Sequence, residues 1–209
     1  MTIKAVIFDI GNVLIGWDPE SFYDSVIGAD RRKRLFAEVD LSGTNEMVDR
    51  GHPMKELMYA KAEEHPEWRD EIRMWHDRWI EMVSPVIEHS VHLQRSLRIK
   101  GIPVLALSNF GVETFEVAEE KFPFLKEFDQ RYISGQMRVI KPDPQIYQQV
   151  EDQCGFEPET LLFVDDRVEN IEAARKRGWH GHIFTDAQGW AEALVSYGLL
   201  TNAEARYDG

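Results

Sequence analysis

The chain has 209 residues, 43% of them hydrophobic, which is enough for one sizeable core domain. Its 37 acidic and 24 basic residues give a net charge of −13, which argues against nucleic acid or an anionic membrane as a partner. The single cysteine, Cys154, excludes an intramolecular disulfide and a cysteine-rich zinc site. We interpret it as a small buried hydrophobe and expect a reducing, cytoplasmic location.

The first predicted strand is the apolar run Ala5–Phe8, which is followed at once by Asp9. Continuous apolar character is typical of a strand buried on both faces of a parallel sheet. Because an unpaired carboxylate is costly to bury, Asp9 is expected at the carboxyl end of the strand, where open α/β sheets bind ligands. A turn or helix-capping aspartate is the alternative, and this stretch alone does not decide between them. Asp9 also interrupts any signal peptide, and no apolar run reaches membrane-spanning length.

Residues 16–91 are predicted to form a helical insertion, because no convincing strand is found there. Helical periodicity runs from Pro19 to about Val39, residues 41–51 read as a loop, and another helix is expected over 53–64. The basic cluster at residues 31–34 is interpreted as a solvated helix face.

An aromatic stripe marks the last helix of this insertion. Spacings of four, three, four and three residues separate Trp68, Ile72, Trp75, Trp79 and Met82. Such spacing places all five side chains on one helix face, which we interpret as core packing rather than a ligand site.

From residue 92 onward, strands and helices alternate, which favours a right-handed parallel sheet with helices on both faces, an α/β fold. The predicted strands cover 104–107, 128–134, 161–164 and 181–184. The predicted helices cover 92–98, 113–122, 169–177 and 188–197. A further helix is expected to begin at Pro144, with Asp143 as its N-cap.

Polar residues follow three of the buried strands: Asp9, the pair Ser108-Asn109, and the pair Asp165-Asp166. Parallel strands bring their carboxyl ends to one edge of the sheet, so these residues are expected to form one site. Carboxylates repel each other unless a cation lies between them, and Mg²⁺ is the expected ion for oxygen ligands. With Ser108, Asn109 and Lys141 as partners for phosphate oxygens, the pattern predicts phosphoryl chemistry.

Four ordered segments carry a family resemblance: Phe8–Leu14, Leu107–Asn109, Lys141–Tyr147 and Phe163–Ile171. Together they resemble the four motifs of the haloacid dehalogenase (HAD) superfamily, and the match spans residues 5 to 185. The resemblance implies a Rossmann-like core, formed by residues 1–15 and 92–209, and a helical cap formed by residues 16–91.

The resemblance also implies the role of each site residue. Asp9 matches the nucleophile that attacks phosphorus to give an aspartyl-phosphate, and with an ordinary carboxyl pKa it would be ionised at neutral pH. Ser108 and Lys141 match the residues that hold the transferring phosphoryl group. The implied Mg²⁺ ligands are Asp9, the main-chain carbonyl of Gly11, and Asp165.

Asp166, beside Asp165, is expected to be a second ligand or to orient the waters of the metal.

Gly11 departs from the superfamily pattern. Phosphatases of the superfamily usually carry a second aspartate two residues after the nucleophile, which protonates the leaving group, and its loss is expected to slow turnover by about a hundred- to ten-thousand-fold. Gly11 with Asn12 resembles a branch that includes bacterial sugar-phosphate phosphatases such as alpha-D-glucose-1-phosphate phosphatase. As a hypothesis, Asp18 supplies the missing proton, and the alternative is an N-cap before Pro19.

The leading functional prediction is a magnesium-dependent phosphatase of a small phosphorylated metabolite, with a sugar phosphate as one candidate, enclosed by the helical cap. A 2-haloacid dehalogenase is the second hypothesis. Such enzymes need no metal and lack the paired acids, so Asp165-Asp166 disfavours it. The third is a catalytically weak protein that binds a phosphorylated metabolite, with Gly11 as the mark of lost turnover.

Cap residues that could contact the substrate are Glu46, Asp49, Arg50 and His52, although a solvated loop explains them equally well. The substrate itself and the oligomeric state are not specified by the sequence.

Overall fold

A parallel five-stranded sheet forms the centre of the molecule, in a computed structural model that describes residues 2–207. The strand order is β5-β4-β1-β6-β7, and every neighbouring pair is parallel. The strands are β1 Ala5–Phe8, β4 Val104–Ser108, β5 Gln130–Ile133, β6 Leu161–Asp165 and β7 His180–Ile183. The predicted Rossmann-like α/β fold is therefore confirmed, and β1 lies at the centre of the sheet, as an apolar run buried on both faces requires.

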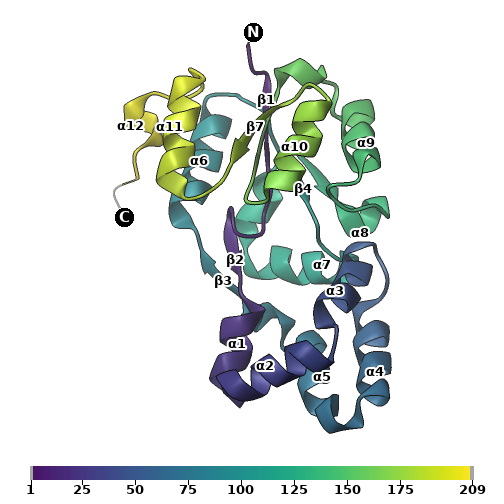
Figure 1. Ribbon diagram of the computed structural model, residues 1–209. Coiled ribbons are helices and arrows are strands. Elements are labelled where there is room, and N and C mark those ends of the chain that lie inside the picture. Colours follow the sequence, from purple (N-terminus) through teal and green to yellow (C-terminus); the bar gives the residue numbers. More distant parts are fainter. Residues whose placement is uncertain (1, 208–209) are drawn as a thin grey trace.

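Helices cover both faces of this sheet (Figure 1). Alternate side chains of β1 pack against the helices of opposite faces. Val6 and Phe8 pack on one face against α6 (Glu88–Ile99), α7 (Val112–Lys121) and α11 (Ala187–Ser196). Ala5 and Ile7 pack on the other against α9 (Pro144–Cys154) and α10 (Val168–Lys176). The period of two in a strand thus divides one apolar run between two hydrophobic clusters.

Short helical segments complete this part of the chain. They are η3 Pro123–Glu127, α8 Ser134–Met137, η4 Pro158–Thr160 and α12 Asn202–Ala205. The predicted helix start at Pro144 is confirmed, because the Asp143 side chain accepts a hydrogen bond from Gln145 N at 2.9 Å. No helix among the described residues combines the length and apolar character needed to cross a membrane.

The remaining helices form a separate group, here called the helical lobe, over residues 19–82. Figure 1 shows it beyond the carboxyl ends of the central strands. Its elements are α1 Pro19–Ile27, α2 Ala29–Glu38, α3 Leu41–Asp49, α4 Met54–Glu64, η1 Pro66–Trp68, α5 Arg69–Asp77 and η2 Trp79–Met82. The lobe therefore lies over the sheet edge where the sequence places the site residues.

Two short strands join the lobe to the sheet, so the prediction that residues 16–91 hold no strand was wrong. β2 (Ile15–Trp17) and β3 (Val83–Val86) pair antiparallel. They escaped sequence reasoning because each is only three or four residues long and Pro85 disfavours a strand. The next helix, α6, begins at Glu88, four residues before the expected start at residue 92.

Helix α3 replaces the loop predicted for residues 41–51. Asp40 caps it by accepting a hydrogen bond from Gly43 N at 2.8 Å, and Leu41, Thr44 and Val48 are buried along one face. The loop was predicted because the Ser-Gly pair at residues 42–43 favours a turn. The N-cap and the helical spacing of the buried residues outweigh that preference, and a helix forms.

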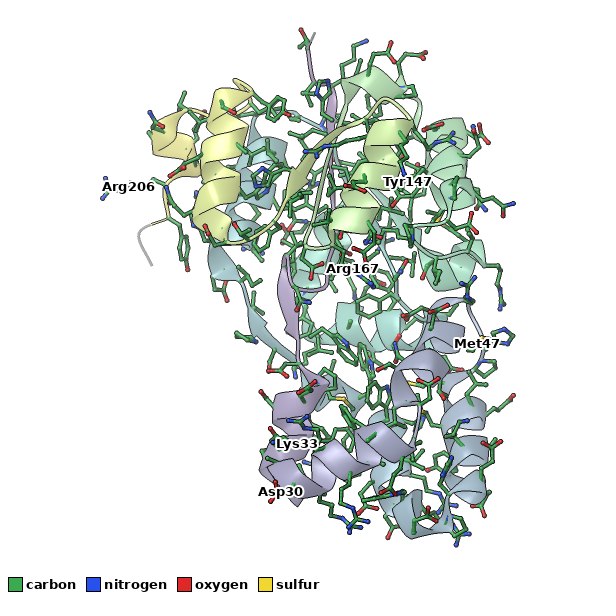
Figure 2. The ribbon with its side chains drawn as sticks, in the orientation of Figure 1. Asp30, Lys33, Met47, Tyr147, Arg167 and Arg206 are labelled. Carbon is green, nitrogen blue, oxygen red and sulfur yellow. The ribbon has the colours of Figure 1, made fainter. Side chains whose placement is uncertain are left out.

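The helix predicted from Pro19 to Val39 is two helices. Gly28, between α1 and α2, adopts φ = +82°, a left-handed backbone conformation that glycine accepts without steric cost. The basic residues 31–34 lie on α2, where Arg31, Lys33 and Arg34 are exposed. Figure 2 shows Lys33 in the lobe, away from the sheet, and its exposure agrees with a solvated helix face.

The aromatic stripe is buried as predicted, although it does not lie on one continuous helix. All five of its residues are at most 7% exposed. They are distributed over η1, α5 and η2. Trp17 of β2 packs against the stripe, with its ring centroid 5.9 Å from the rings of both Trp75 and Trp79. The stripe is therefore the core of the lobe.

Candidate active site

The predicted strand ends meet at one point of the sheet. β1 lies between β4 and β6, so Asp9, Ser108 and Asp165 come from adjacent strands. Ser108 Oγ donates a hydrogen bond to Asp9 Oδ1 at 2.6 Å, across 99 residues of sequence. The topology thus assembles one polar cluster from three distant segments, where open parallel sheets place their ligands.

Asp9 is buried, and its carboxylate has one engaged oxygen and one available oxygen. Oδ1 accepts hydrogen bonds from Ile10 N at 2.7 Å and Ser108 Oγ at 2.6 Å, and lies 2.9 Å from Lys141 Nζ. Among the described residues, no polar contact reaches Oδ2. Burial raises the pKa of Asp9 to about 7, although the positive charge of Lys141 acts to lower it. The carboxyl group therefore does not have the ordinary pKa assumed from sequence, and its ionisation depends on neighbouring cations.

Lys141 lies between two carboxylates in the interior. Its Nζ is 2.6 Å from Asp165 Oδ2 and 2.9 Å from Asp9 Oδ1, and it donates to Leu107 O at 3.0 Å. These three acceptors match the three protons of an ammonium group. Burial acts to lower the pKa of Lys141, but Asp165 and Asp9 outweigh it, so the pKa is raised and the side chain is cationic.

Asn109 holds the backbone of Lys141. Its Oδ1 accepts from Lys141 N at 2.8 Å, and its Nδ2 donates to Lys141 O at 3.1 Å. Both ends of the amide are therefore engaged by the segment that carries the lysine. The structure places Asn109 at the pocket wall, beside Ser108, but its hydrogen bonds position Lys141.

The two adjacent acids of the last motif face different surroundings. Asp165 is fully buried; Oδ1 accepts from Arg167 N at 2.8 Å and Asn170 Nδ2 at 2.9 Å, and Oδ2 faces Lys141. Asp166 lines the pocket instead, and burial raises its pKa. Neighbouring residues at a strand end point to opposite sides, which separates the roles of the two carboxylates.

Asn12 is a site residue that sequence reasoning missed. It adopts φ = +56°, a left-handed conformation that asparagine tolerates better than most residues. Its Nδ2 donates to Asp166 Oδ2 at 3.1 Å, and its Oδ1 accepts from Trp17 N at 2.9 Å. Asn12 thereby links the turn after β1 to the acid after β6 and to strand β2.

The acidic residues fit a divalent cation. Carboxylate oxygens of Asp9, Asp165 and Asp166 lie within 4.8 Å of one another. Gly11 lines the same pocket, and the buried Oδ1 of Asn170 receives no hydrogen bond from the described residues. An all-oxygen set with three carboxylates is the type of site that hard ions such as Mg²⁺ prefer.

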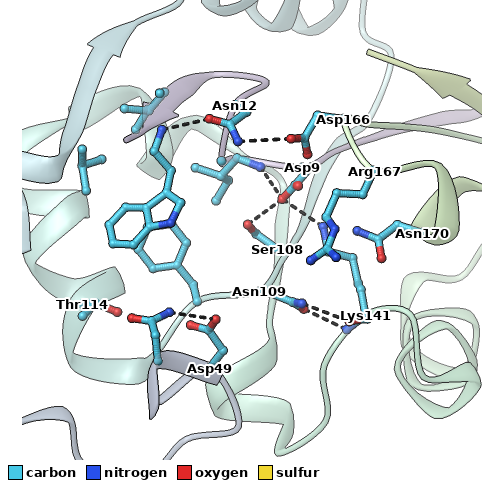
Figure 3. Close-up of a pocket in the computed structure, with 18 of the residues that line it drawn as sticks. Asp9, Asn12, Asp49, Ser108, Asn109, Thr114, Lys141, Asp166, Arg167 and Asn170 are labelled. Atoms are coloured by element: carbon cyan, nitrogen blue, oxygen red, sulfur yellow. Dashed lines mark hydrogen bonds and ion pairs between the residues drawn. The ribbon is translucent and has the colours of Figure 1, made fainter. Parts of the chain in front are cut away.

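A cavity of about 270 Å³ opens beside this cluster, between the sheet edge and the helical lobe (Figure 3). Figure 2 shows Arg167, which also lines it, at the junction of the two parts. Apolar side chains form part of the wall: Ile15, Trp17, Trp79, Val83 and Phe110. The lobe adds polar groups through Asn45 and Asp49 of α3. A pocket of mixed apolar and polar lining suits a small organic ligand.

Of the four lobe residues proposed as substrate contacts, only Asp49 lines this cavity. Glu46 and Arg50 form a salt bridge with each other at 2.9 Å, and His52 is exposed. Asn45, one helical turn before Asp49, lines the cavity as well and was missed. The spacing of four residues would have paired them, had α3 been recognised as a helix.

Asp18 lies outside the residues that line the cavity. Its Oδ1 accepts a hydrogen bond from Ser21 N at 2.9 Å at the start of α1, and these bonds lower its pKa. The structure therefore shows the N-cap that the sequence offered as the alternative role of Asp18. A carboxylate with a lowered pKa and an engaged oxygen is poorly suited to carry a proton.

Comparison with known proteins identifies the family to which the chain is similar. The sequence profile described as haloacid dehalogenase-like hydrolase matches residues 3–178. The chain is 26% identical over 187 residues to a sesquiterpene phosphatase of Aspergillus oryzae, covering 89% of this chain and 92% of that protein. It is also 31% identical over 85 residues to an (S)-2-haloacid dehalogenase of Pseudomonas fluorescens, covering 41% of this chain and 37% of that protein.

A solved structure shares the fold. It is a HAD family enzyme of Bacteroides thetaiotaomicron in complex with magnesium and inorganic phosphate, and it superimposes with a TM-score of 0.71 at 21% identity. The similarity covers 91% of this chain and 98% of that one.

Proposed function

This chain belongs to the haloacid dehalogenase-like hydrolase family, and from that premise we propose that it is a magnesium-dependent phosphatase of a small phosphate monoester. The observation that carries the proposal is the cluster of three carboxylates, within 4.8 Å of one another, beside the buried ammonium of Lys141. Paired acids with a metal suit attack on a phosphate dianion, whose charge must be compensated.

The nucleophile in this proposal is Asp9 Oδ2, the oxygen left available by the contacts at Oδ1. It forms a bond to phosphorus while the ester P–O bond breaks, and the leaving oxygen takes the electron pair. Water then attacks phosphorus, the bond to Asp9 breaks, and inorganic phosphate is released. Ser108 and Lys141 hold the phosphoryl oxygens by hydrogen bonding and charge.

Asp9, the carbonyl of Gly11 and Asp166 would hold the metal, with Asp165 holding Lys141 in place. This assignment differs from the one implied by the family resemblance, in which Asp165 is the direct ligand. It is supported by the full engagement of Asp165 with Lys141, Asn170 and the chain, and by the position of Asp166 in the pocket wall. When bound, Mg²⁺ supplies positive charge at the phosphate oxygens.

The helical lobe is proposed to act as the cap of the site, because Asn45, Asp49 and Trp79 contribute to the pocket wall. Its apolar residues would contact the organic part of the substrate and exclude water. A phosphorylated metabolite is thus the proposed partner, and the cytoplasmic location stays a prediction.

A panel of phosphate monoesters tests the proposal: a sugar phosphate, an isoprenoid alcohol phosphate and two aryl phosphates. Phosphate release is measured with Mg²⁺ and with a chelator, and Asp9→Asn is the control. We expect release only with Mg²⁺ and none from Asp9→Asn. Full activity of Asp9→Asn would exclude the covalent route.

The partial match to a dehalogenase justifies a second assay, of halide release from 2-haloacids in the presence of chelator. Halide release without phosphatase activity would identify a dehalogenase. Tight binding of a phosphate ester without product over long incubation would instead identify a phospho-metabolite-binding protein.

A further inference from the structure

The turn after β1 lacks a proton carrier but has room for one. Gly11 has no side chain, and an added Cβ there would meet no heavy atom within 4 Å. The proposed reaction still needs a proton for the leaving oxygen, because an alkoxide is a poor leaving group at neutral pH. The carrier must therefore be sought elsewhere in the pocket wall.

Asp49 is the carboxylate that the lobe presents to the pocket. It is half-buried at the end of α3, and Figure 3 shows it in the wall formed by the lobe, apart from Asp9 and Asp166 at the sheet edge. In a displacement at phosphorus, the nucleophile and the leaving oxygen lie roughly in line. A nucleophile on the sheet therefore directs the leaving oxygen toward the lobe.

The position of Asp49 in its helix offers no structural reason for a carboxylate. The last turn of a helix carries the negative end of the helix dipole, which disfavours an acidic side chain. Asp40 and Asp18, by contrast, cap helix N-termini. Asp49 forms no salt bridge with any described residue, and its carboxylate accepts one hydrogen bond, from Asn45 Nδ2 at 3.2 Å.

Several contacts hold Asp49 over the pocket. Its main-chain oxygen accepts a 2.6 Å hydrogen bond from Ser134 Oγ, and Ser134 is fully buried in the sheet domain. Asn45 is oriented in turn by Trp75, whose Nε1 donates to Asn45 Oδ1 at 3.0 Å. The Asp49 side chain is thus positioned through both its backbone and its amide neighbour, as an acid–base group requires.

The charges around Asp49 favour exchange of a proton near neutral pH. Burial raises the pKa of Asp49 to about 7, with a further rise from Glu46 on the same helix. Lys141 acts to lower it and Asp9 to raise it, both across the pocket. Groups with a pKa near the working pH are the most effective acid–base catalysts.

We propose that Asp49 is the proton carrier of the phosphatase reaction and replaces the acid that Gly11 lacks. This inference rests on the proposed function. As the P–O ester bond breaks, the leaving oxygen takes the proton of Asp49. In the second step, water forms its bond to phosphorus, the bond to Asp9 Oδ2 breaks, and the proton of that water passes to Asp49. Both protons are thus accounted for within one turnover.

Esters with different leaving groups distinguish a proton-transfer role of Asp49 from a role in substrate binding. Asp49→Asn keeps the size of the side chain but cannot donate or accept the proton. Rapid-mixing kinetics are compared for 4-nitrophenyl phosphate, whose leaving group needs no protonation, and for phenyl phosphate, whose leaving group does. We expect the first turnover of the nitrophenyl ester to keep its rate and that of the phenyl ester to fall about a hundred-fold or more.

A second signature is expected in the same experiment. Because Asp49→Asn also slows hydrolysis of the aspartyl-phosphate, 4-nitrophenolate should appear as a burst of one equivalent per active site, followed by slow turnover. An equal loss with both esters and no burst would overturn the proposal. A wild-type protein inactive on both esters with Mg²⁺ would refute the phosphatase function itself, which is a separate outcome.

The open space at Gly11 permits a rescue. Gly11→Asp in the Asp49→Asn background should restore turnover by at least ten-fold, whereas Gly11→Asn should not. Asp49→Ser repeats the comparison with a smaller side chain, should Asp49→Asn fail to fold. Glu46→Gln lies on the same helix but outside the pocket. Assayed well below pH 7, where Asp49 stays protonated in both proteins, it is expected to show the same dependence on the leaving group as the wild type. Absence of rescue in folded double variants would count against a proton-transfer role.

Discussion

The ammonium of Lys141 and the carboxylate of Asp165 form an ion pair with 2.6 Å between Nζ and Oδ2, and neither side chain is more than 1% exposed. Asp9 shares the same lysine at 2.9 Å. The proposed nucleophile and one acid of the last motif are therefore joined by a single buried cation, which we expect to serve both the fold and the site.

Replacement of Lys141 by methionine should destabilise the protein as well as inactivate it. Removing one partner of a buried ion pair leaves an unpaired charge and costs about 3–5 kcal/mol. Urea unfolding followed by circular dichroism measures the loss, and the exposed Lys126→Met is the matched control, with no expected change. A stability equal to that of the wild type would show that the pair contributes nothing net.

Magnesium should stabilise the protein through Asp166. A ligand that binds only the folded state contributes about 2.7 kcal/mol at a hundred times its Kd. Thermal unfolding with increasing MgCl₂ should therefore show a rising Tm in the wild type and in Asp49→Asn. In Asp166→Asn the rise should be lost or require far more metal, and a normal response there would refute the assignment of Asp166 as a ligand.

The first-turnover rate with phenyl phosphate should fall as pH rises through about 7, the raised pKa of Asp49. The sign follows from the role: the protonated acid donates in the first step, and it is lost above its pKa. Glu46→Gln removes a negative charge that raises this pKa, so the fall should move to lower pH. Asp49→Asn should abolish this fall in rate with rising pH. A fall that persists in the variant would show that another group titrates.

The contact between α3 and the start of α7 should set the position of Asp49. A Cβ at Gly111 would lie 2.5 Å from Val48 Cγ1 and 2.9 Å from Thr114 Oγ1, so these neighbours must shift in Gly111→Ala, and we expect the end of α3 to move with Val48. We expect a fall in kcat/KM of about ten-fold or more, since small misplacements of catalytic groups are costly. Val48→Ala should restore much of it in the double variant.

Gly189→Ala is the control for that experiment, because the nearest atom to its Cβ lies at an ordinary 3.6 Å. An unaffected kcat/KM in Gly111→Ala would show that the lobe tolerates displacement.

The sheet and the residues at its edge were accessible from sequence, because each depends on local pattern. The apolar run Ala5–Phe8 predicts a strand buried on both faces, and Asp9 is the next residue. Parallel topology then brings Ser108 and Asp165 to the same edge without any further information.

The division of roles between Asp165 and Asp166 was not accessible, since adjacent identical residues differ only in the side of the chain they face. Lys141 selects Asp165 through a contact between segments 24 residues apart. Asp49 was proposed only as one of several loop residues, because the Ser-Gly pair concealed helix α3. Its main chain is held at the pocket by the hydrogen bond from Ser134 Oγ, a contact between residues 85 positions apart that sequence spacing does not encode.

Strands β2 and β3 give the lobe a particular form of attachment. Trp17 pairs with Val83 and Ile15 with Val86, and Ile87 N donates to Leu14 O at 2.8 Å. The segments that leave and re-enter the sheet domain thus lie side by side. They resemble the two strands of a β-hairpin in which the helical lobe takes the place of the turn. Paired strands lie about 5 Å apart, so a short turn across them could replace the lobe without altering the register of the remaining chain.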